Sequence, residues 1–331
     1  MAFRDAEHVV LPVPNGWYAV AFSRDLIPGQ VLPIHYFGED MVLFRTRSGQ
    51  ARVLDAFCPH LGAHVGEGGR VIGESVRCPF HGWEYDGETG ACVKIPYCDT
   101  IPKAARLGAW HTREKNGMVF VWYHSARREP LWDFPTLEEL SDEEWSEPIC
   151  FSLEVEAHVQ DMHENNNDPV HFNYVHGLAG EAPPGEIEYS SDPRHYRIVN
   201  QGETETAIGE FNTTLVRDSW GVGMSAVRLE GIPGAGILLF SSTTPIALDP
   251  PRTLSRWVLS ATKNMIDHAG DDFMHRLMEG VEQDQRIWRN KVHRVRPLFC
   301  KADTFLIEYR KWVRQFYEDA PEERTLTSGG N

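Results

Sequence analysis

The chain has 331 residues, of which 41% are hydrophobic and 24% are charged, and these proportions fit one or two globular domains. The formal net charge of −16 argues against nucleic-acid binding, because phosphate contacts need basic patches. The longest apolar run, at 236–240, is far too short to span a bilayer. We therefore expect a globular protein without a nucleic-acid partner or a membrane span.

The six cysteines and the N-terminus indicate a reducing compartment. The cysteines stand at 58, 78, 92, 98, 150 and 300 and show no disulfide-framework spacing. Residues 1–18 lack the basic region and apolar core of a signal peptide, and they contain no N-terminal membrane anchor. We expect a cytoplasmic protein.

The first third of the chain predicts a small all-β domain. Short β-rich runs at 31–37, 41–46 and 51–56 are separated by the turn sequences PGQ, GED and SGQ. A hairpin is predicted around DGETG within 83–96, and the strongest strand, MVFVWYH, follows at 118–124.

Two short metal-ligand pairs lie in the middle of this domain. Cys58 and His60 form a C-x-H pair, and Cys78 and His81 form a C-x-x-H pair. A Rieske-type [2Fe–2S] centre takes two thiolates on one iron and two imidazoles on the other, and this set supplies both. A Cys2His2 zinc site uses the same ligand types, although zinc fingers usually pair Cys with Cys and His with His along the chain. A third histidine, His64, is predicted to be structural, since both pairs are complete without it.

The segment after the β domain changes character. Acidic residues dominate 137–147, LEELSDEEWSE, for which we predict a solvated surface helix. An alternating strand is expected at 150–159.

A second candidate site follows at 160–177, QDMHENNNDPVHFNYVHG. His171 and His176 are five residues apart, so a helix and the turn that ends it near Gly177 can bring both to one iron. A mononuclear iron that activates dioxygen commonly binds two histidines and one carboxylate. His163 is a competing ligand, although a solvent-exposed or supporting histidine is the preferred interpretation.

The carboxylate has to come from elsewhere, and 270–293 predicts a helix that could carry it. One face of this helix would combine Val281, Asp284, Ile287, Trp288 and Lys291. An acid on an apolar face is costly unless a metal or a charged partner compensates it. From spacing alone, Asp284 is either a metal ligand or the partner of Lys291 or Arg286 in a surface salt bridge.

The region between these two segments predicts a sheet. The β-rich runs within 178–262 suggest antiparallel strands that form a substrate pocket behind the iron. An amphipathic aromatic helix at 305–319 is expected to pack on that sheet.

These motifs resemble the Rieske non-haem iron oxygenases. The similarity is carried by CPHLGAHVGEGGRV and CPFHGWEYDGETGACVKIPY, by Asp168 with His171 and His176, and by EQDQRIWRNK. The resemblance is nearest to the branch of the 3-ketosteroid 9α-hydroxylase oxygenase and cholesterol 7-desaturase. It implies an α+β chain: an N-terminal all-β Rieske domain at 14–126, after a short extension at 1–13, and a catalytic domain at 127–331. The latter is a helix-covered antiparallel sheet of the helix-grip, START-like type.

The resemblance also implies the roles of the site residues. Cys58, His60, Cys78 and His81 would hold the cluster, and His171, His176 and Asp284 the mononuclear Fe(II). In this family an aspartate bridges a cluster histidine of one subunit and an iron histidine of the next, a role that falls to Asp168. Glu164 stands at the family pattern's position four before this aspartate, and no role is assigned to it.

The function that the resemblance implies is that of a terminal oxygenase component. Such a protein uses O2 and electrons from a separate NAD(P)H-dependent reductase, with or without a ferredoxin, and assembles as a homotrimer. The expected reaction is hydroxylation of an apolar, steroid-like ring compound. Aromatic ring dihydroxylation and O- or N-demethylation are alternatives at the same kind of site, and a Rieske electron carrier is the alternative without an enzymatic activity.

Overall fold

A computed structural model describes residues 8–176, 185–206, 209–269, 272–318 and 324–326. The chain divides into two compact units. The small unit comprises Trp17–Tyr123 with Glu129–Leu131, and the large unit comprises the remaining residues. The domain limits given above, 14–126 and 127–331, stay a prediction.

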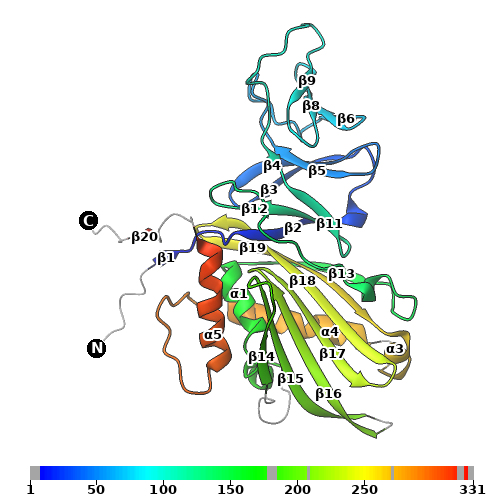
Figure 1. The fold of residues 1–331 in the computed structure, drawn as a ribbon, viewed down its shortest axis with the longest axis vertical. Coiled ribbons are helices and arrows are strands. Elements are labelled where there is room, and N and C mark those ends of the chain that lie inside the picture. The colour runs from blue at the N-terminus through cyan, green and yellow to red at the C-terminus, as the bar shows by residue number, and fades with distance from the viewer. Residues whose placement is uncertain (1–7, 177–184, 207–208, 270–271, 319–323, 327–331) are drawn as a thin grey trace. The chain divides into compact units, whose positions relative to one another are not determined.

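The small unit contains three antiparallel sheets (Figure 1). In sheet order, the first consists of β10 (Ala109–Trp110), β5 (Ala51–Asp55), β4 (Glu39–Arg45) and β3 (Val31–Tyr36). The second consists of β11 (Thr112–Lys115), β12 (Met118–Tyr123) and β2 (Gly16–Phe22), and η1 (Ser23–Asp25) follows β2. The third consists of β6 (Arg70–Ile72), β7 (Ser75–Arg77), β8 (Glu84–Asp86) and β9 (Cys92–Lys94).

The first and third sheets position the two cysteine-histidine loops. Strand β5 runs into Cys58 and strand β7 runs into Cys78. Both cysteines are buried in an apolar cluster with residues such as Val65, Val76 and Tyr85. The loops therefore start from a packed core, which fixes where their side chains emerge.

The large unit is built on one seven-stranded sheet in which every neighbouring pair is antiparallel (Figure 1). The strands in sheet order are β13 (Ile149–Val155), β19 (Pro251–Ala261), β18 (Ala235–Leu248), β17 (Met224–Ile232), β16 (Gly209–Trp220), β15 (His195–Thr206) and β14 (Gly185–Tyr189). A separate pair joins β1 (His8–Val10) to β20 (Arg324–Leu326).

Helices cover one face of the large sheet (Figure 1). They are α1 (Val159–Asn166), α2 (His171–Val175), α3 (Lys263–Ala269), α4 (Phe273–Trp288) and α5 (Thr304–Trp312), the last followed by η3 (Val313–Tyr317). Side chains of α3 and α4, including Ile266 and Met274, pack against Ile237 and Leu259 of the sheet. The α+β fold predicted from the sequence, an all-β domain followed by a helix-covered antiparallel sheet, is confirmed.

Helix α1 is polar in sequence but buried from Val159 to Glu164. Residues from the C-terminal part of the chain contact its polar side chains: Tyr317 donates to Gln160, His293 contacts Asp161, and Tyr309 contacts His163. Buried polar groups are costly unless they are hydrogen-bonded. The end of the chain therefore holds in place the helix that leads into the second candidate site.

Two sequence predictions differ from the structure. The helix predicted at 137–147 is wrong, because this acidic segment forms only a single 3-10 turn, η2 (Glu138–Leu140). Here Arg228 pairs with Glu139, and turn hydrogen bonds to Asp142 replace a helical ladder. The face predicted for α4 is also wrong in part: Val281, Asp284 and Trp288 are buried, whereas Ile287 is 47% exposed and Lys291 lies beyond the helix end.

Candidate metal centres

The two cysteine-histidine loops have the same backbone construction. The amide of Gly62 donates to the carbonyl of Cys58, and that of Gly82 donates to the carbonyl of Cys78. Each glycine has a positive φ, +73° and +75°, which a side chain would strain. Each cysteine amide in turn donates to the carbonyl five residues later. The loops are thus two copies of one turn, each presenting a thiol and an imidazole.

The side chains of these loops suit a two-iron cluster. The rings of His60 and His81 lie 4.6 Å apart, centroid to centroid, and His60 stacks on Trp83. The Nδ1 atom of His60 is buried and has no hydrogen-bond partner among the described residues. Burial, together with the nearby Cys58, raises the pKa of the Cys78 thiol, a cost that metal binding removes.

A single zinc ion does not fit these four side chains. Zn–S and Zn–N bonds of about 2.0–2.3 Å would bring all four donor atoms within about 4 Å of one another. No three of the four donor atoms gather within 4.8 Å of one another in the described part of the chain. The wider spacing agrees with ligands divided between two irons.

The second site gathers three donor atoms in the large unit. The ligand atoms of His171, His176 and Asp284 lie within 4.8 Å of one another. The Nε2 atoms of His171 and His176 are 4.0 Å and 3.5 Å from Oδ1 of Asp284. Helix α2 begins at His171, and His176 caps its end, so the five-residue spacing works because the helix stops between them.

The second nitrogen of each ring is already engaged, which aims Nε2 at the centre. Nδ1 of His171 donates to the backbone carbonyl of Asp168 at 2.5 Å. Nδ1 of His176 is 3.0 Å from Oε1 of Gln283. Metal-binding histidines almost always donate their other ring nitrogen in this way, because the bond fixes the tautomer and the ring orientation.

Asp284 lies beside the two histidines with its Oδ1 free of hydrogen bonds among the described residues. The side chain is buried. Such an oxygen is costly to bury unless a cation binds it. The alternative of a salt bridge with Lys291 is not supported, because Lys291 pairs instead with Asp161 and Glu164 of helix α1.

The electrostatics of the two histidines differ. Contact with the Asp284 carboxylate raises the pKa of His176. Burial lowers the pKa of His171, although Asp284 opposes the shift. The neutral imidazole is the metal-binding form, so burial favours that form in His171, whereas the Asp284 carboxylate favours the protonated form of His176.

The three donor atoms open onto a cavity of about 510 Å³ between the helices and the sheet. Its size suits a multi-ring organic molecule. Much of its lining is apolar, including Phe172, Val227, Leu239, Leu277, Val281 and Trp288. The exposed Arg276 and Glu279 of α4 also line it.

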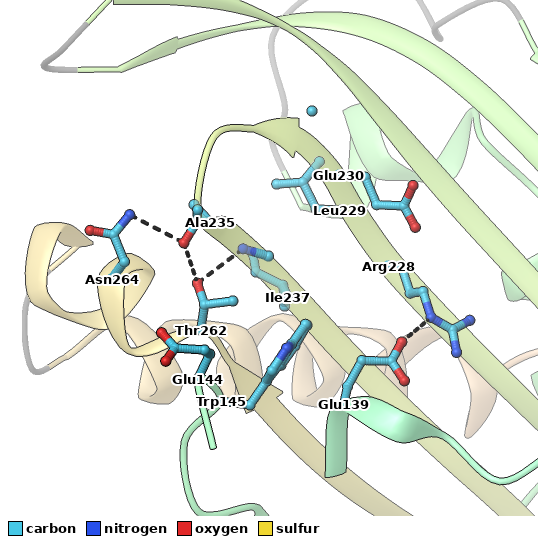
Figure 2. Close-up of a pocket in the computed structure, with 13 residues that line it drawn as sticks. Glu139, Glu144, Trp145, Arg228, Leu229, Glu230, Ala235, Ile237, Thr262 and Asn264 are labelled. Carbon is cyan, nitrogen blue, oxygen red and sulfur yellow. Dashed lines mark hydrogen bonds and ion pairs between the residues drawn. The ribbon is translucent and has the colours of Figure 1, made fainter. Parts of the chain in front are cut away.

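A second hollow of about 360 Å³ lies at the β17–β18 turn and holds no histidine or cysteine (Figure 2). Its polar groups are joined to one another: Arg228 pairs with Glu139, and Thr262 and Asn264 both donate to the carbonyl of Gly234. Because these polar groups already bond to one another, we interpret this hollow as part of the fold rather than as a metal centre.

The other predicted residues have specific places. The Asp168 carboxylate accepts the backbone amide of Val170, so its link to His171 runs through its backbone carbonyl. His163 lies outside the three-ligand group and contacts Tyr309. It is buried rather than solvent-exposed. Glu164 forms ion pairs with Lys291 and Arg310, which gives it a structural place.

Several supporting residues were not found from the sequence. Gln283 orients His176, and Tyr85 lies 3.0 Å from the sulfur of Cys58. Arg217 is fully buried behind α2, bonds the carbonyl of Asn166, and lies over the ring of Phe172. The adjacency of Gln283 to Asp284 was an available signal. Nothing in the sequence marks Arg217, whose role depends on strand register.

Comparisons with known proteins match both parts of the chain. Residues 16–105 match the Rieske [2Fe-2S] domain, and residues 121–317 match the 3-Ketosteroid 9alpha-hydroxylase C-terminal domain. Cholesterol 7-desaturase nvd 1 of Ciona intestinalis is 32% identical over 95% of this chain and 71% of that protein. The oxygenase component of 3-ketosteroid-9-alpha-monooxygenase from Rhodococcus rhodochrous is 26% identical over 93% and 81%.

Solved structures share the fold at low identity. NdmA of Pseudomonas putida CBB5 with caffeine superposes with a TM-score of 0.73 at 19% identity, covering 95% of this chain and 97% of that one. Dicamba monooxygenase bound to dicamba gives a TM-score of 0.73 at 16% identity, covering 92% and 97%.

The two units and their metal centres are those of a Rieske non-haem iron oxygenase. Within that class, the chain belongs to the family defined by the 3-ketosteroid 9alpha-hydroxylase C-terminal domain. Members of the class carry a [2Fe–2S] cluster and a mononuclear iron, and they receive electrons from a reductase or ferredoxin. In the described part of the chain, no helix combines the length and apolar character that crossing a membrane requires.

Proposed function

We propose that this chain is a terminal oxygenase that oxidises an apolar, steroid-like ring compound at an iron held by His171, His176 and Asp284. The observation that carries the proposal is the buried, unpartnered Oδ1 of Asp284, which faces two correctly oriented Nε2 atoms at the edge of an apolar cavity. The steroid class is supported by the two relatives named above and by the cavity volume.

The cluster ligands in this proposal are Cys58, His60, Cys78 and His81. When bound, the cluster passes single electrons and the iron reacts with dioxygen. The protein contributes position: His171, His176 and Asp284 would hold the metal at the edge of the cavity, where substrate can reach it. The apolar lining keeps water away from the reacting atoms.

We also propose a homotrimer in which Asp168 joins the two centres across a subunit boundary, with His60 or His81 of a neighbouring copy at one end. The hydrogen bond from His171 to the carbonyl of Asp168 supports this, because it couples that residue directly to an iron ligand. Light scattering of the purified protein tests the assembly: a monomer under all conditions contradicts it. The cytoplasmic location predicted from the sequence stays a prediction.

The experiment for the activity supplies the purified holoenzyme with NAD(P)H, a compatible reductase and isotope-labelled dioxygen. Steroids and smaller aromatic ring compounds are offered in parallel, and products are identified by mass spectrometry. We expect a labelled hydroxyl group or a new double bond in a steroid. Electron consumption without substrate oxidation for every compound contradicts the proposal, and labelled diols or demethylated products would instead favour the aromatic alternatives.

A further inference from the structure

One wall of the metal-containing cavity is polar, in contrast to the rest of its lining. Ser225 of β17, Ser241 and Thr243 of β18, and Ser255 of β19 all line it. We call these four residues the hydroxyl wall. Each is at most 8% exposed, so the four hydroxyls are shielded from bulk water.

Strand register arranges the hydroxyl wall as two pairs. Ser225 lies opposite Ser241, and Thr243 lies opposite Ser255. In each pair the two hydroxyl oxygens are 2.9 Å apart. Residues two apart on a strand share a face, which is why both pairs meet the same cavity.

Each pair has one proton more than it uses. A hydroxyl donates one hydrogen bond and accepts up to two. Two paired hydroxyls therefore use only one of their two O–H donors in the bond between them. The described residues provide no further hydrogen bond to any of the four side chains. Two spare donors are therefore left at the wall, and a buried donor without an acceptor is unfavourable.

A third donor adjoins the wall. Trp257 lies opposite Ser241 on the next strand and also lines the cavity. Its indole Nε1 is buried and bonds to no described residue. Stacking on Phe151, with ring planes 9° apart, holds the ring in place. An indole N–H can only donate, so it adds to the excess of donors.

An excess of fixed donors facing an apolar cavity calls for an acceptor from outside the protein. We propose that the hydroxyl wall binds an acceptor oxygen, a ketone or a hydroxyl, on the otherwise apolar ring substrate. This contact would fix which carbon of the rings faces His171, His176 and Asp284. The inference rests on the proposed function, and it makes the preferred substrate an oxygenated ring compound rather than a hydrocarbon.

The test compares matched ligands and matched variants in the metal-loaded holoenzyme without oxygen. The ligands are a 3-ketosteroid, the corresponding 3-alcohol and the same steroid skeleton lacking the oxygen, and binding is measured by calorimetry or by quenching of tryptophan fluorescence. The variants are S225A/S241A and T243V/S255A. Each removes a whole pair, so that no orphaned hydroxyl remains. The control is S242A, since Ser242 neighbours the wall on β18 but points to the opposite face of the sheet.

We expect the ketone-to-hydrocarbon affinity ratio to fall by about tenfold in at least one double variant, the scale of one lost hydrogen bond. The control should keep the wild-type ratio. Whether the alcohol follows the ketone tells which kind of oxygen the wall prefers.

Unchanged ratios in both double variants, or equal losses for ketone and hydrocarbon, would overturn the proposal. So would a wild-type protein that binds none of the oxygenated ligands. Failure of the proposed function would look different, because it would appear as missing mononuclear iron or as missing oxygen-dependent turnover. The binding preference is measured without turnover, so its presence or absence is decided separately.

Discussion

Replacing Asp284 with Asn separates the metal-binding role of this side chain from its effect on the fold. Asp284→Asn keeps the shape but removes the charge from the oxygen that faces both histidines at 3.5 and 4.0 Å. We expect mononuclear iron to be lost and the [2Fe–2S] cluster to be retained, because the cluster ligands lie in the small unit. Losing a direct ligand should weaken iron binding by more than the roughly 10–100-fold cost of losing an outer hydrogen-bond partner.

The same change should not stabilise the iron-free protein. Asn keeps a buried oxygen at this place and adds two donors, and the contact by which the Asp284 carboxylate raises the pKa of His176 is lost. The iron-free variant should therefore unfold at or below the temperature of the iron-free wild type. Added Fe(II) should then raise the unfolding temperature of the wild type but leave that of the variant unchanged.

Metal analysis and calorimetry with and without Fe(II) check both parts. Glu279→Gln is the matched control, because Glu279 also lines the cavity from α4 but lies outside the three-ligand group and is exposed. It should keep its iron. An Asp284→Asn protein with a full complement of mononuclear iron would refute the reasoning and point to another carboxylate.

Three further predictions concern the neighbours of the site. Gln283→Leu removes the partner of His176 and should weaken iron binding about 10–100-fold in a metal titration; unaltered affinity would show that this bond is incidental. Asp168→Asn should keep both metal centres but stop coupled turnover, since the amide oxygen can still accept the backbone N–H of Val170 while the bridging charge is gone; normal product formation would refute the bridge. Burial lowers the pKa of His158 and of His163 to about 4. Each is therefore neutral when folded but takes up a proton near pH 6.5 when unfolded, so the free energy of unfolding should fall from pH 6.5 to 4 by about 3 kcal/mol per histidine, and a flat urea-denaturation profile would contradict this.

The sequence identifies residues whose chemistry depends on short spacing. Cys58, His60, Cys78 and His81 can be paired by inspection because each pair lies within one turn. The same holds for His171 and His176, which one helix end brings together. Asp284 is different, since it is more than a hundred residues away. Its apolar surroundings on α4 marked it, but they left a salt bridge open until the position of Lys291 was known.

The features that sequence reasoning missed depend on tertiary contacts. The acidic segment at 137–147 has helical composition, yet contacts such as Arg228 with Glu139 favour turns. The hydroxyl wall requires the register of β17, β18 and β19, because serines scattered along the chain carry no signal until strands place them side by side. Long-range pairing of this kind is set by the whole sheet rather than by local preference.

The central claim is that each chain holds two separate iron centres, and the most direct test is a count of iron and acid-labile sulfide in anaerobically purified protein, with an EPR spectrum after dithionite reduction. The account predicts about three irons and about two sulfides per chain with a Rieske-type signal. Zinc without sulfide, or only about two irons per chain that iron reconstitution fails to raise, would contradict it.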